Sequence, residues 1–422
     1  MEPMIYRILL LVLLLTPFSA MAENRIKHIE ISGLEYSDAR VVTRELPFTE
    51  GDEWQVEFAT IGSRRLRNLG LFSEAVITPP DDNGVVRIRV NDRWSLWLLP
   101  EGSRSDSGAT SAGITLTEHN LWGLHHNLRL AIRRDTGINF SGNNGASYQA
   151  AYNWRRISDT NYGLDLSINH GTTIFDAYQN GVISSSYLSD QTSWSAGVSY
   201  GFGPVPGEGW DARLGFSSNS TAYQLKSGPA LADVLGLRRQ ALSFSANYRM
   251  IDDHVTWLTG NEIDYSFEVA HKVLGSSINS YKHTFSWRRH LDIGNQNTFS
   301  YRVNAGLLTG NILRDGLFDV GSRNGLRGYY PGELQGNAYL YGTLEGRHPL
   351  EVNSNFQLAA FVDVGHVNRD GQSALGKAIA VGIGGGVRWT LRWLVNGTIR
   401  VDGAYGFATK KWRLYLGTGQ AF

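Results

Sequence analysis

Along most of the chain, apolar and polar residues alternate with a period of two. From Trp94 onward, runs such as the one from Leu242 to Met250 place an apolar residue at every second position, and clusters of Gly, Asn, Ser or Asp separate the runs. This period is typical of β-strands that have one apolar and one polar face. Residues 93–422 are therefore predicted to form a mainly β domain.

The alternating runs number sixteen. They lie near residues 94–104, 111–118, 126–134, 146–156, 162–170, 192–202, 209–217, 239–250, 257–270, 281–290, 296–308, 337–346, 355–366, 378–390, 397–407 and 412–422. Bacterial outer-membrane barrels have an even number of antiparallel strands, with an apolar outer face and a polar interior. We therefore predict a 16-stranded transmembrane antiparallel β-barrel. The competing fold is a soluble all-β repeat protein, which would not need so many outward-facing aromatic residues.

The segment that precedes the barrel, residues 23–92, has a different pattern. We expect a strand near 26–31, a short helix capped by Ser37 or Asp38 and reaching Leu46, a second helix near 55–68, and strands at 72–78 and 85–90. The helices are indicated by apolar stripes and cap residues, and the last two strands by a Pro/Asp/Asn/Gly turn between them. The order β-α-α-β-β predicts one small α+β domain.

The first residues have the pattern of a secretory signal. Arg7 precedes the apolar run from Ile8 to Leu15, and Ala20 to Ala22 form a small-x-small cleavage site, so residues 1–22 are predicted to be a signal peptide. A membrane anchor is the alternative, but the run is shorter than the roughly 20 apolar residues that a spanning helix needs. After residue 22 the sequence predicts no transmembrane helix.

Composition narrows the function classes. The 39 basic and 39 acidic residues balance, which argues against a nucleic-acid partner. The chain has no Cys, which excludes disulfides, thiol catalysis and a lipoprotein signal. Its 48 Gly, 19 Tyr, 17 Phe and 12 Trp suit a barrel with tight curvature and aromatic interfacial girdles.

A long loop, residues 309–336, lies between the eleventh and twelfth expected strands and contains Arg327 among Gly and aromatic residues. Such an arginine is suited to a loop that folds back into a narrow, wet interior and binds a carboxylate there. Strand parity supplies candidates, because Glu345, Asp363 and Asp402 each occupy inward positions next to outward apolar residues.

The sequence Leu-Arg-Gly-Tyr at 326–329 resembles the signature of the outer-membrane protein "Eighty-Five" superfamily, which includes BamA, TamA and FhaC. The stretch Phe-Val-Asp-Val-Gly at 361–365 resembles the second motif of that family. The resemblance implies a loop lock inside the barrel in which Arg327 bonds Asp363 and Tyr329 packs against the wall. The residues of the expected lock are Arg327, Gly328, Tyr329, Phe361, Asp363 and Gly365. Glu345 and Asp402 are further candidate partners, with solvation in the lumen as the alternative.

The N-terminal domain resembles a POTRA domain, notably where Gly70-Leu71-Phe72 enters the second strand. Only one such module is found, whereas members such as BamA have several. In the family these modules receive unfolded clients by adding a strand to an exposed sheet edge. The resemblance implies that Phe72, Val76 and Thr78 mark that edge. The alternative is a structural spacer or plug.

The resemblance implies an outer-membrane assembly or translocation factor that receives unfolded clients in the periplasm and inserts or exports them through the barrel. A pore dedicated to one exported protein and a porin without a client are the alternatives. The expected partners are the outer-membrane lipid bilayer and unfolded outer-membrane or secreted proteins.

We expect no enzymatic activity, cofactor or metal. His119, His125 and His126 are close in sequence, but a metal site needs side chains that converge from one face. The glycine-rich stretch at 382–386 lacks the following helix of a phosphate loop and indicates a thin barrel wall. A Gly-x-Ser-x-Gly elbow of a serine hydrolase is missing from the sequence.

Overall fold

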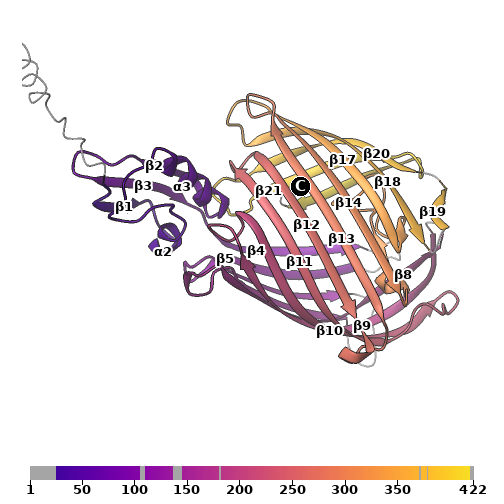
Figure 1. The fold of residues 1–422 in the computed structure, drawn as a ribbon. Coiled ribbons are helices and arrows are strands. Elements are labelled where there is room, and N and C mark those ends of the chain that lie inside the picture. Colours follow the sequence, from indigo (N-terminus) through magenta and orange to yellow (C-terminus); the bar gives the residue numbers. More distant parts are fainter. Residues whose placement is uncertain are drawn as a thin grey trace, which may run out of the picture.

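A computed structural model describes residues 25–104, 110–135, 145–179, 182–369, 372–377 and 379–418. The expected signal peptide, residues 1–22, lies outside these residues. A long antiparallel sheet curls into a barrel, and a small α+β domain lies against one end of it (Figure 1). We call that end the proximal rim and the opposite end the distal rim.

The prediction of sixteen barrel strands is confirmed. They are β4 (Leu96–Arg104), β5 (Thr110–Leu121), β6 (His126–Asp135), β7 (Ala146–Trp154), β8 (Tyr162–Gln179), β9 (Val182–Gly201), β10 (Gly209–Ser227), β11 (Leu237–Asp253), β12 (Leu258–Ala270), β13 (Ser280–Asp292), β14 (Thr298–Gly310), β17 (Ala338–Pro349), β18 (Phe356–Arg369), β20 (Ala380–Thr390), β21 (Thr398–Gly406) and β22 (Lys411–Thr418). A short strand, β19 (Gln372–Lys377), pairs with the end of β18 just before β20. Each long strand pairs antiparallel with the next, from β4 to β22.

Three strands are longer than the sequence pattern predicts. β8 continues to Gln179 instead of ending near residue 170, β9 begins at Val182 instead of near 192, and β10 continues to Ser227. These extensions contain many Ser and Thr residues and lack the period-two alternation. Beyond the hydrocarbon layer a strand can be polar on both faces, so the pairing continues where the apolar signal stops.

The alternation of outward and inward residues is confirmed where the loop chemistry was expected. In β17, Leu340 and Leu344 on the outer face are 58% and 52% exposed, whereas Glu345 is fully buried. In β18, Leu358 and Val364 are exposed on the outer face, and the intervening inward residues are buried. The parity of the barrel strands therefore brings carboxylates into the interior.

The N-terminal domain has the predicted β-α-α-β-β order. Its elements are β1 (His28–Ser32), α2 (Ala39–Thr43), α3 (Glu57–Asn68), β2 (Phe72–Thr78) and β3 (Val85–Asp92). β3 is the central strand of the sheet; it pairs parallel with β1 and antiparallel with β2. Asp38 caps α2 by accepting from the Arg40 amide, and α2 ends at Thr43, earlier than the expected limit at Leu46.

The core of this domain includes a residue from the barrel. Val41, Leu66 and Phe72 come from α2, α3 and β2, and Val395 joins them from the turn between β20 and β21. Val395 is 2% exposed. The N-terminal domain is therefore packed against the hairpin that β20 and β21 form.

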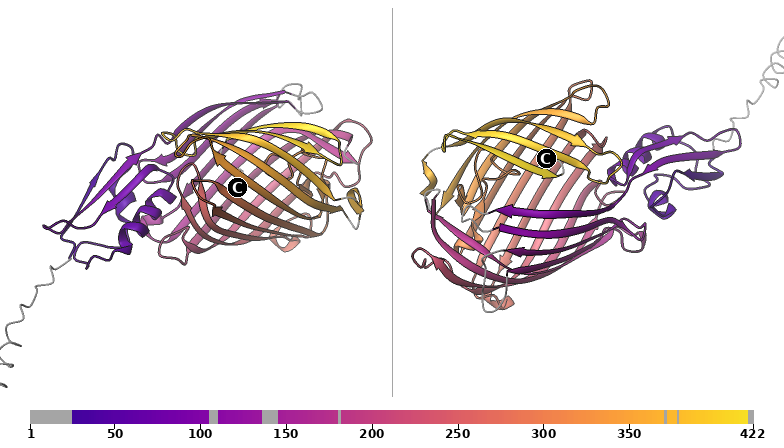
Figure 2. Two further views of the ribbon diagram at one scale, coloured as in Figure 1. Left: turned by 90° about the horizontal axis from the view of Figure 1, so that it is seen from above. Right: turned by 180° about the vertical axis from the view of Figure 1, so that it is seen from behind.

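Helix α3 docks on the proximal rim through charged groups, and two further views place the whole domain at this end of the barrel (Figure 2). Arg65 Nε lies 2.9 Å from Glu208 Oε2 in the turn between β9 and β10, and Arg67 Nη2 lies 2.7 Å from Asp252 Oδ1 of β11. Asn68 donates to the Ile251 carbonyl at 2.7 Å. Several partly buried ion pairs therefore hold the domain in place.

Next to the seam between the first and last barrel strands, the described contacts join the segment before β4 to the turn between β20 and β21 at the proximal rim. The strand order places β22 beside β4. Within the residues that the structure describes, no residue register joins these two strands, whereas the Trp94 amide donates to the Trp393 carbonyl at 2.9 Å. In the same described ranges, none of the helices is long and apolar enough to cross a membrane.

Candidate functional site

The loop between β14 and β17 folds back into the barrel. It contains a short 3-10 helix, η3 (Arg314–Gly316), and the two-residue strands β15 (Phe318–Asp319) and β16 (Gln335–Gly336). Leu326 and Tyr329 are fully buried in a cluster that also contains Val367 of β18 and Ala380 of β20. The middle of the loop is therefore packed on the inner wall formed by the C-terminal strands.

The structure places Arg327 against Asp363, the pairing that the family resemblance implies. Arg327 Nε and Nη2 donate to the two carboxylate oxygens of Asp363 at 2.8 and 3.0 Å, and the Arg327 amide donates to Asp363 Oδ2 at 3.0 Å. Arg327 is 1% exposed and Asp363 is fully buried. A planar guanidinium suits this two-point contact, which adds geometric specificity to the charge attraction.

The structure also brings both other candidate carboxylates to the same arginine. Arg327 Nη1 donates to Glu345 Oε2 at 2.7 Å and lies 3.8 Å from Asp402 Oδ2. Glu345 and Asp402 are fully buried. The alternative that these two carboxylates are simply solvated in the lumen is therefore wrong.

Three inward arginines that the sequence analysis did not assign to the site complete the charge network. Arg347 Nε donates to Glu345 Oε1 at 2.7 Å, and Arg388 Nη1 donates to Asp402 Oδ1 at 2.5 Å. Arg400 Nη2 donates to the Asn324 side-chain oxygen of the loop at 2.6 Å. Parity could have marked Arg347 and Arg388 as inward, but only the register between strands brings them to these carboxylates.

Phe361 supplies an aromatic floor for the arginine. The Arg327 guanidinium carbon lies 3.3 Å from the centroid of the Phe361 ring, and Phe361 is 3% exposed. A guanidinium over an aromatic face gains a cation–π attraction of about 0.5–2 kcal/mol. The ring therefore restricts the plane of Arg327 and orients its donors toward the carboxylates.

The backbone after Arg327 is held by tyrosine hydroxyls. Tyr415 of β22 accepts from the Gly328 amide at 2.8 Å and donates to the Tyr329 carbonyl at 2.9 Å. The Tyr329 hydroxyl donates to the Val381 carbonyl at 2.9 Å. The loop is therefore bonded to β20 and β22 as well as to β17 and β18.

Close approach of the loop requires glycines in the wall. A Cβ at Gly365 would lie 3.0 Å from Leu326 Cδ1 and 2.4 Å from Tyr341 Cβ, and one at Gly382 would lie 1.9 Å from the Arg327 carbonyl oxygen. Gly382 belongs to the glycine-rich stretch that the sequence indicated as a thin wall. Its function in the fold is to let the loop backbone touch β20.

The tip of the loop contacts the last strands directly. Arg323 donates to the Leu416 carbonyl of β22 at 3.0 Å, and Arg413 of β22 donates to Glu333 at 2.6 Å. Because β22 borders the seam, the loop connects the wall at β17 and β18 to the strand that borders the seam. The arrangement fixes the positions of the loop backbone and of the strands that it contacts.

The histidines that are close in sequence do not converge. His119 bonds Asn127, His126 bonds the Tyr152 hydroxyl, and His125 is buried in the turn that contacts the N-terminal domain. Among the residues that the structure describes, no group of three or more His, Asp or Glu side chains is arranged to hold a metal ion.

The expected client edge lies on β2, which borders β3 on one side and is an edge strand of its sheet. Phe72 points into the domain core and is fully buried, Val76 is half-buried, and Thr78 is exposed. A partner at this edge would therefore pair with the backbone and meet Val76 and Thr78 rather than Phe72.

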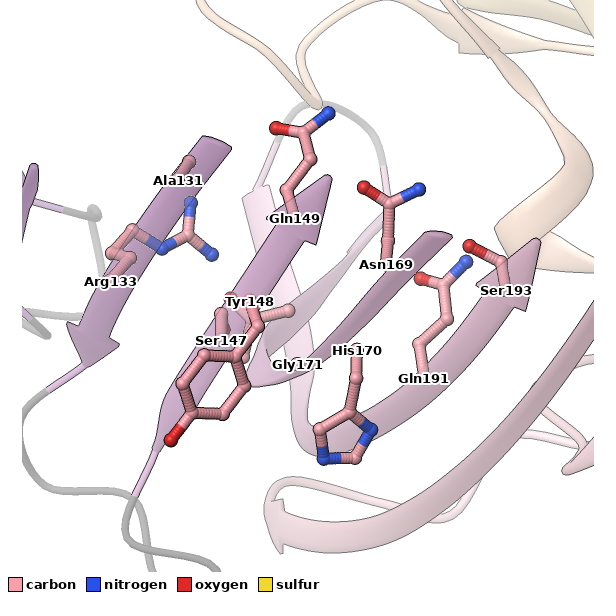
Figure 3. Close-up of a pocket in the computed structure, with 11 residues that line it drawn as sticks. Ala131, Arg133, Ser147, Tyr148, Gln149, Asn169, His170, Gly171, Gln191 and Ser193 are labelled. Atoms are coloured by element: carbon pink, nitrogen blue, oxygen red, sulfur yellow. The ribbon is translucent and has the colours of Figure 1, made fainter. Parts of the chain in front are cut away.

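A pocket of about 350 Å³ lies on the inner face of β6 to β9, across the barrel from the loop lock. Gln149, Asn169 and Gln191 rise from neighbouring strands on one side of the sheet, whereas the rings of Tyr148 and His170 lie on the other side (Figure 3). Apart from Arg133, the inward residues that line this pocket are uncharged. The interior thus has a charged wall occupied by the loop, a second charged stretch at β12 and β13 where Arg288 pairs with Glu262 and Asp264, and a patch of polar and amide side chains at β6 to β9.

Comparison with known proteins places these features in context. The Omp85 superfamily domain model matches residues 120–422. A curated relative, the outer membrane protein assembly factor BamA of Neorickettsia risticii, is 25% identical over 179 residues, which are 42% of this chain. The match spans only 22% of the length of that relative.

Solved structures share the fold over nearly the whole chain. The match to CdiB from Escherichia coli has a TM-score of 0.62 at 13% identity, and it covers 94% of this chain and 74% of the CdiB chain. CdiB from Acinetobacter baumannii gives 0.57 at 16% identity, covering 93% and 73%. BamA from Haemophilus ducreyi lacking POTRA domains 1-3 gives 0.54 at 15% identity, covering 93% and 83%. At these identities the similarity is one of fold.

Proposed function

Because this chain belongs to the Omp85 superfamily, we propose that it is an assembly or translocation factor for unfolded client proteins. In this proposal the N-terminal domain, residues 23–92, is a POTRA domain in the periplasm, and the proximal rim faces the periplasm. Residues 93–422 form the barrel in the outer membrane. The domain receives a client, which is then inserted or exported through the barrel.

The observation that carries the proposal is the edge strand β2 beside the proximal rim. An edge strand presents unpaired backbone N–H and C=O groups, which pair with any extended chain regardless of its side chains. An unfolded client exposes the same groups. The domain is held at the rim by the α3 ion pairs, so a client bound to β2 would be held beside the barrel.

The loop lock has a structural role in this proposal, and no enzymatic step is assigned to it. Arg327 holds the loop on β17 and β18, while Tyr415 and Arg413 join the same loop to β22. The loop therefore sets the position of the strand at the seam. We propose that it keeps the C-terminal wall rigid while a client engages the seam between β4 and β22.

A pore dedicated to one exported protein is the second candidate. The wall at β6 to β9 favours it, because the pocket beside Gln149 and Asn169, whose inward lining is uncharged apart from Arg133, offers an extended chain few strong charges to bind it tightly. A structural or poorly conducting porin without a client is the third candidate.

Depletion of the protein in its host, followed by quantitative proteomics of the outer membrane and the medium, separates the candidates. A general assembly factor predicts loss of many different barrels from the membrane. A dedicated pore predicts loss of one protein from the medium while other barrels persist. Unchanged membrane and medium proteomes would contradict both and leave the porin.

Topology is tested with a single cysteine, since the natural chain has none. Asp159 lies in the turn between β7 and β8 and pairs with Arg44 of the N-terminal domain at 3.1 Å, so the proposal places it on the periplasmic side. In intact cells an impermeant maleimide should not label Asp159→Cys, but it should label it after the outer membrane is made permeable. Equal labelling in intact cells would invert the proposed orientation.

A further inference from the structure

Aromatic side chains form a belt on the outer face of the barrel at the proximal rim. Rings of this proximal belt contact one another in the pairs Trp122–His126, Tyr162–Tyr200 and Trp210–Tyr248, with centroids 5.8, 4.8 and 5.3 Å apart. In membrane barrels such rings lie at the level of the lipid headgroups, because one part of each ring is apolar and the other is polar. The proximal belt therefore marks the headgroup layer of the leaflet at this rim.

The N-terminal domain adds one ring beside this belt. Tyr36, in the segment between β1 and α2, is 42% exposed and packs edge-on against Trp94, with ring centroids 5.4 Å apart. Trp94 shares the outward parity of Leu96 and Leu98, both of which are exposed on the outer face of β4. Tyr36 therefore lies on the lipid side of the first barrel strand and not at the lumen.

A buried carboxylate fixes the segment that carries Tyr36. Asp92, the last residue of β3, accepts from the backbone amides of Tyr36 and Ser37 at 2.9 and 2.7 Å, and from the Ser37 hydroxyl at 3.0 Å. Hydrogen bonds to an ionised acceptor are the stronger kind. Since the chain continues from Asp92 through Arg93 to Trp94, the carboxylate holds the Tyr36 backbone next to the start of the barrel.

The turn between β5 and β6 binds the same segment from the barrel side. The Asp38 amide donates to the Gly123 carbonyl at 2.9 Å, and the Asn120 side chain donates to the Tyr36 carbonyl at 3.3 Å. This turn also carries Trp122, which belongs to the proximal belt and is 71% exposed. The ring of the domain and the rings of the barrel are thus attached to one junction.

A phenol ring gains from the headgroup layer, where its apolar body leaves water while its hydroxyl stays wet. The ring of Tyr36 continues the proximal belt, so the same lipid layer that meets the belt meets Tyr36. A soluble partner would have to occupy a place that the bilayer around the barrel already fills. The continuity with the belt therefore selects lipid as the occupant.

We propose that Tyr36 anchors the N-terminal domain in the headgroup layer of the leaflet at the proximal rim. The partner is the headgroup and glycerol region of a phospholipid bilayer. The domain is then held by lipid beside β4 as well as by the α3 ion pairs at β9 to β11. The inference goes beyond the proposed function, because it holds for an assembly factor, a dedicated pore or a porin.

The test uses the full-length protein in phosphatidylcholine vesicles with one added cysteine that carries the fluorophore NBD. Ala39→Cys places the label on an exposed residue three positions after Tyr36, and Asp82→Cys places it in the exposed turn between β2 and β3, at the end of β3 away from the barrel. Lipids with a nitroxide on the headgroup quench the label when it is near the membrane surface. Lipids with the nitroxide deep in the acyl chain report insertion beyond the headgroups.

We expect headgroup nitroxide to quench the label at Ala39→Cys about two-fold more than the label at Asp82→Cys, and more than deep nitroxide does, because the belt lies at headgroup level. Tyr36→Ser should remove about half of the quenching at Ala39→Cys, and Tyr36→Trp should keep it, since both aromatic rings suit this layer. Val56→Ser, which removes another exposed apolar residue of the domain, is the matched control and should change nothing. Folding of each variant is checked by the mobility shift of unheated barrels in gels.

Equal quenching at Ala39→Cys and Asp82→Cys would overturn the anchor. Quenching that is unchanged in Tyr36→Ser would overturn it too, because the segment would then lie near lipid without using the ring. A loss in Tyr36→Ser that Tyr36→Trp shares would assign the effect to a disturbed segment and would also contradict the anchor. The depletion experiment decides the proposed function independently of these results.

Discussion

The carbonyl oxygen of Arg327 occupies the space in front of Gly382, so that a Cβ at Gly382 would lie 1.9 Å from it. The loop backbone and the β20 wall are therefore in direct contact, and the position of the Arg327 side chain depends on it. The ion pairs and the glycine in the wall belong to one arrangement.

Gly382→Ala should displace the loop, because real Cβ atoms do not approach an oxygen so closely and the nearest atom is backbone. The measurement is the rate at which a maleimide labels a unique cysteine, Ser322→Cys, which lies in the same loop. We expect the rate to rise about 10-fold, as a displacement that costs ~1–2 kcal/mol would produce. Gly403→Ala, whose added Cβ meets nothing within 4 Å, is the matched control and should leave the rate unchanged. An unchanged rate in Gly382→Ala would show that the contact is not needed.

Tyr415→Phe should loosen the same loop to a smaller extent. The substitution removes the hydroxyl that bonds the Gly328 amide and the Tyr329 carbonyl, and a buried polar group without a partner costs about 1–3 kcal/mol. Labelling of Ser322→Cys should therefore accelerate several-fold, whereas Tyr405→Phe on the outer face of β21 should have no effect. Equal rates in the two variants would mean that water replaces the Tyr415 hydroxyl.

Acid should weaken the docking of the N-terminal domain through His125. Burial, followed by the nearby charges of Arg155 and Arg44, holds the pKa of His125 well below its ordinary value, so His125 is neutral in the folded protein. In a state where the domain is undocked and His125 is exposed to water, the imidazole would bind a proton near pH 6.5. The free energy that favours the docked state is therefore fully present above that pH and is lost as the pH falls below it. Limited proteolysis of the domain should be faster at pH 5 than at pH 7.5.

His125→Asn should reduce this pH dependence. His125 has a φ of 60°, a conformation that Asn tolerates, and the Asn side chain does not titrate in this range. His170→Asn, on the outer face of β8, is the control and should leave the pH dependence as it is. A pH profile that is the same in wild type and His125→Asn would assign the effect to other groups.

The alternation of apolar and polar residues predicted most of the barrel strands. It does so because the side chains of a strand between lipid and an aqueous lumen alternate between the two faces, whatever the neighbouring strands are. The same parity placed Glu345, Asp363 and Asp402 in the interior. The family resemblance, which is confirmed by the match over residues 120–422, supplied the pairing of Arg327 with Asp363.

Other features depend on contacts between distant segments. Nothing in the sequence around Val395 indicates that this residue packs into the core of the N-terminal domain, which lies more than three hundred residues earlier in the chain. The distal parts of β8 and β9 have no alternation to read, because Ser and Thr lie on both faces there while Ala177 and Tyr187 are buried in a small apolar cluster. Arg347 and Arg388 are inward by parity, but their partners follow from the register of three strands, which a single sequence does not contain.

The central claim is that Arg327 and Asp363 act as one unit that pins the loop to the wall. A double-mutant cycle with Arg327→Ala and Asp363→Ala, read by the labelling rate of Ser322→Cys, tests it most directly. Breaking a buried pair costs about 3–5 kcal/mol and less where water enters, so each single variant should label ~10- to 100-fold faster than wild type. The account predicts that the double variant labels little faster than either single variant. Rates that multiply in the double variant would contradict it, because the two side chains would then act independently.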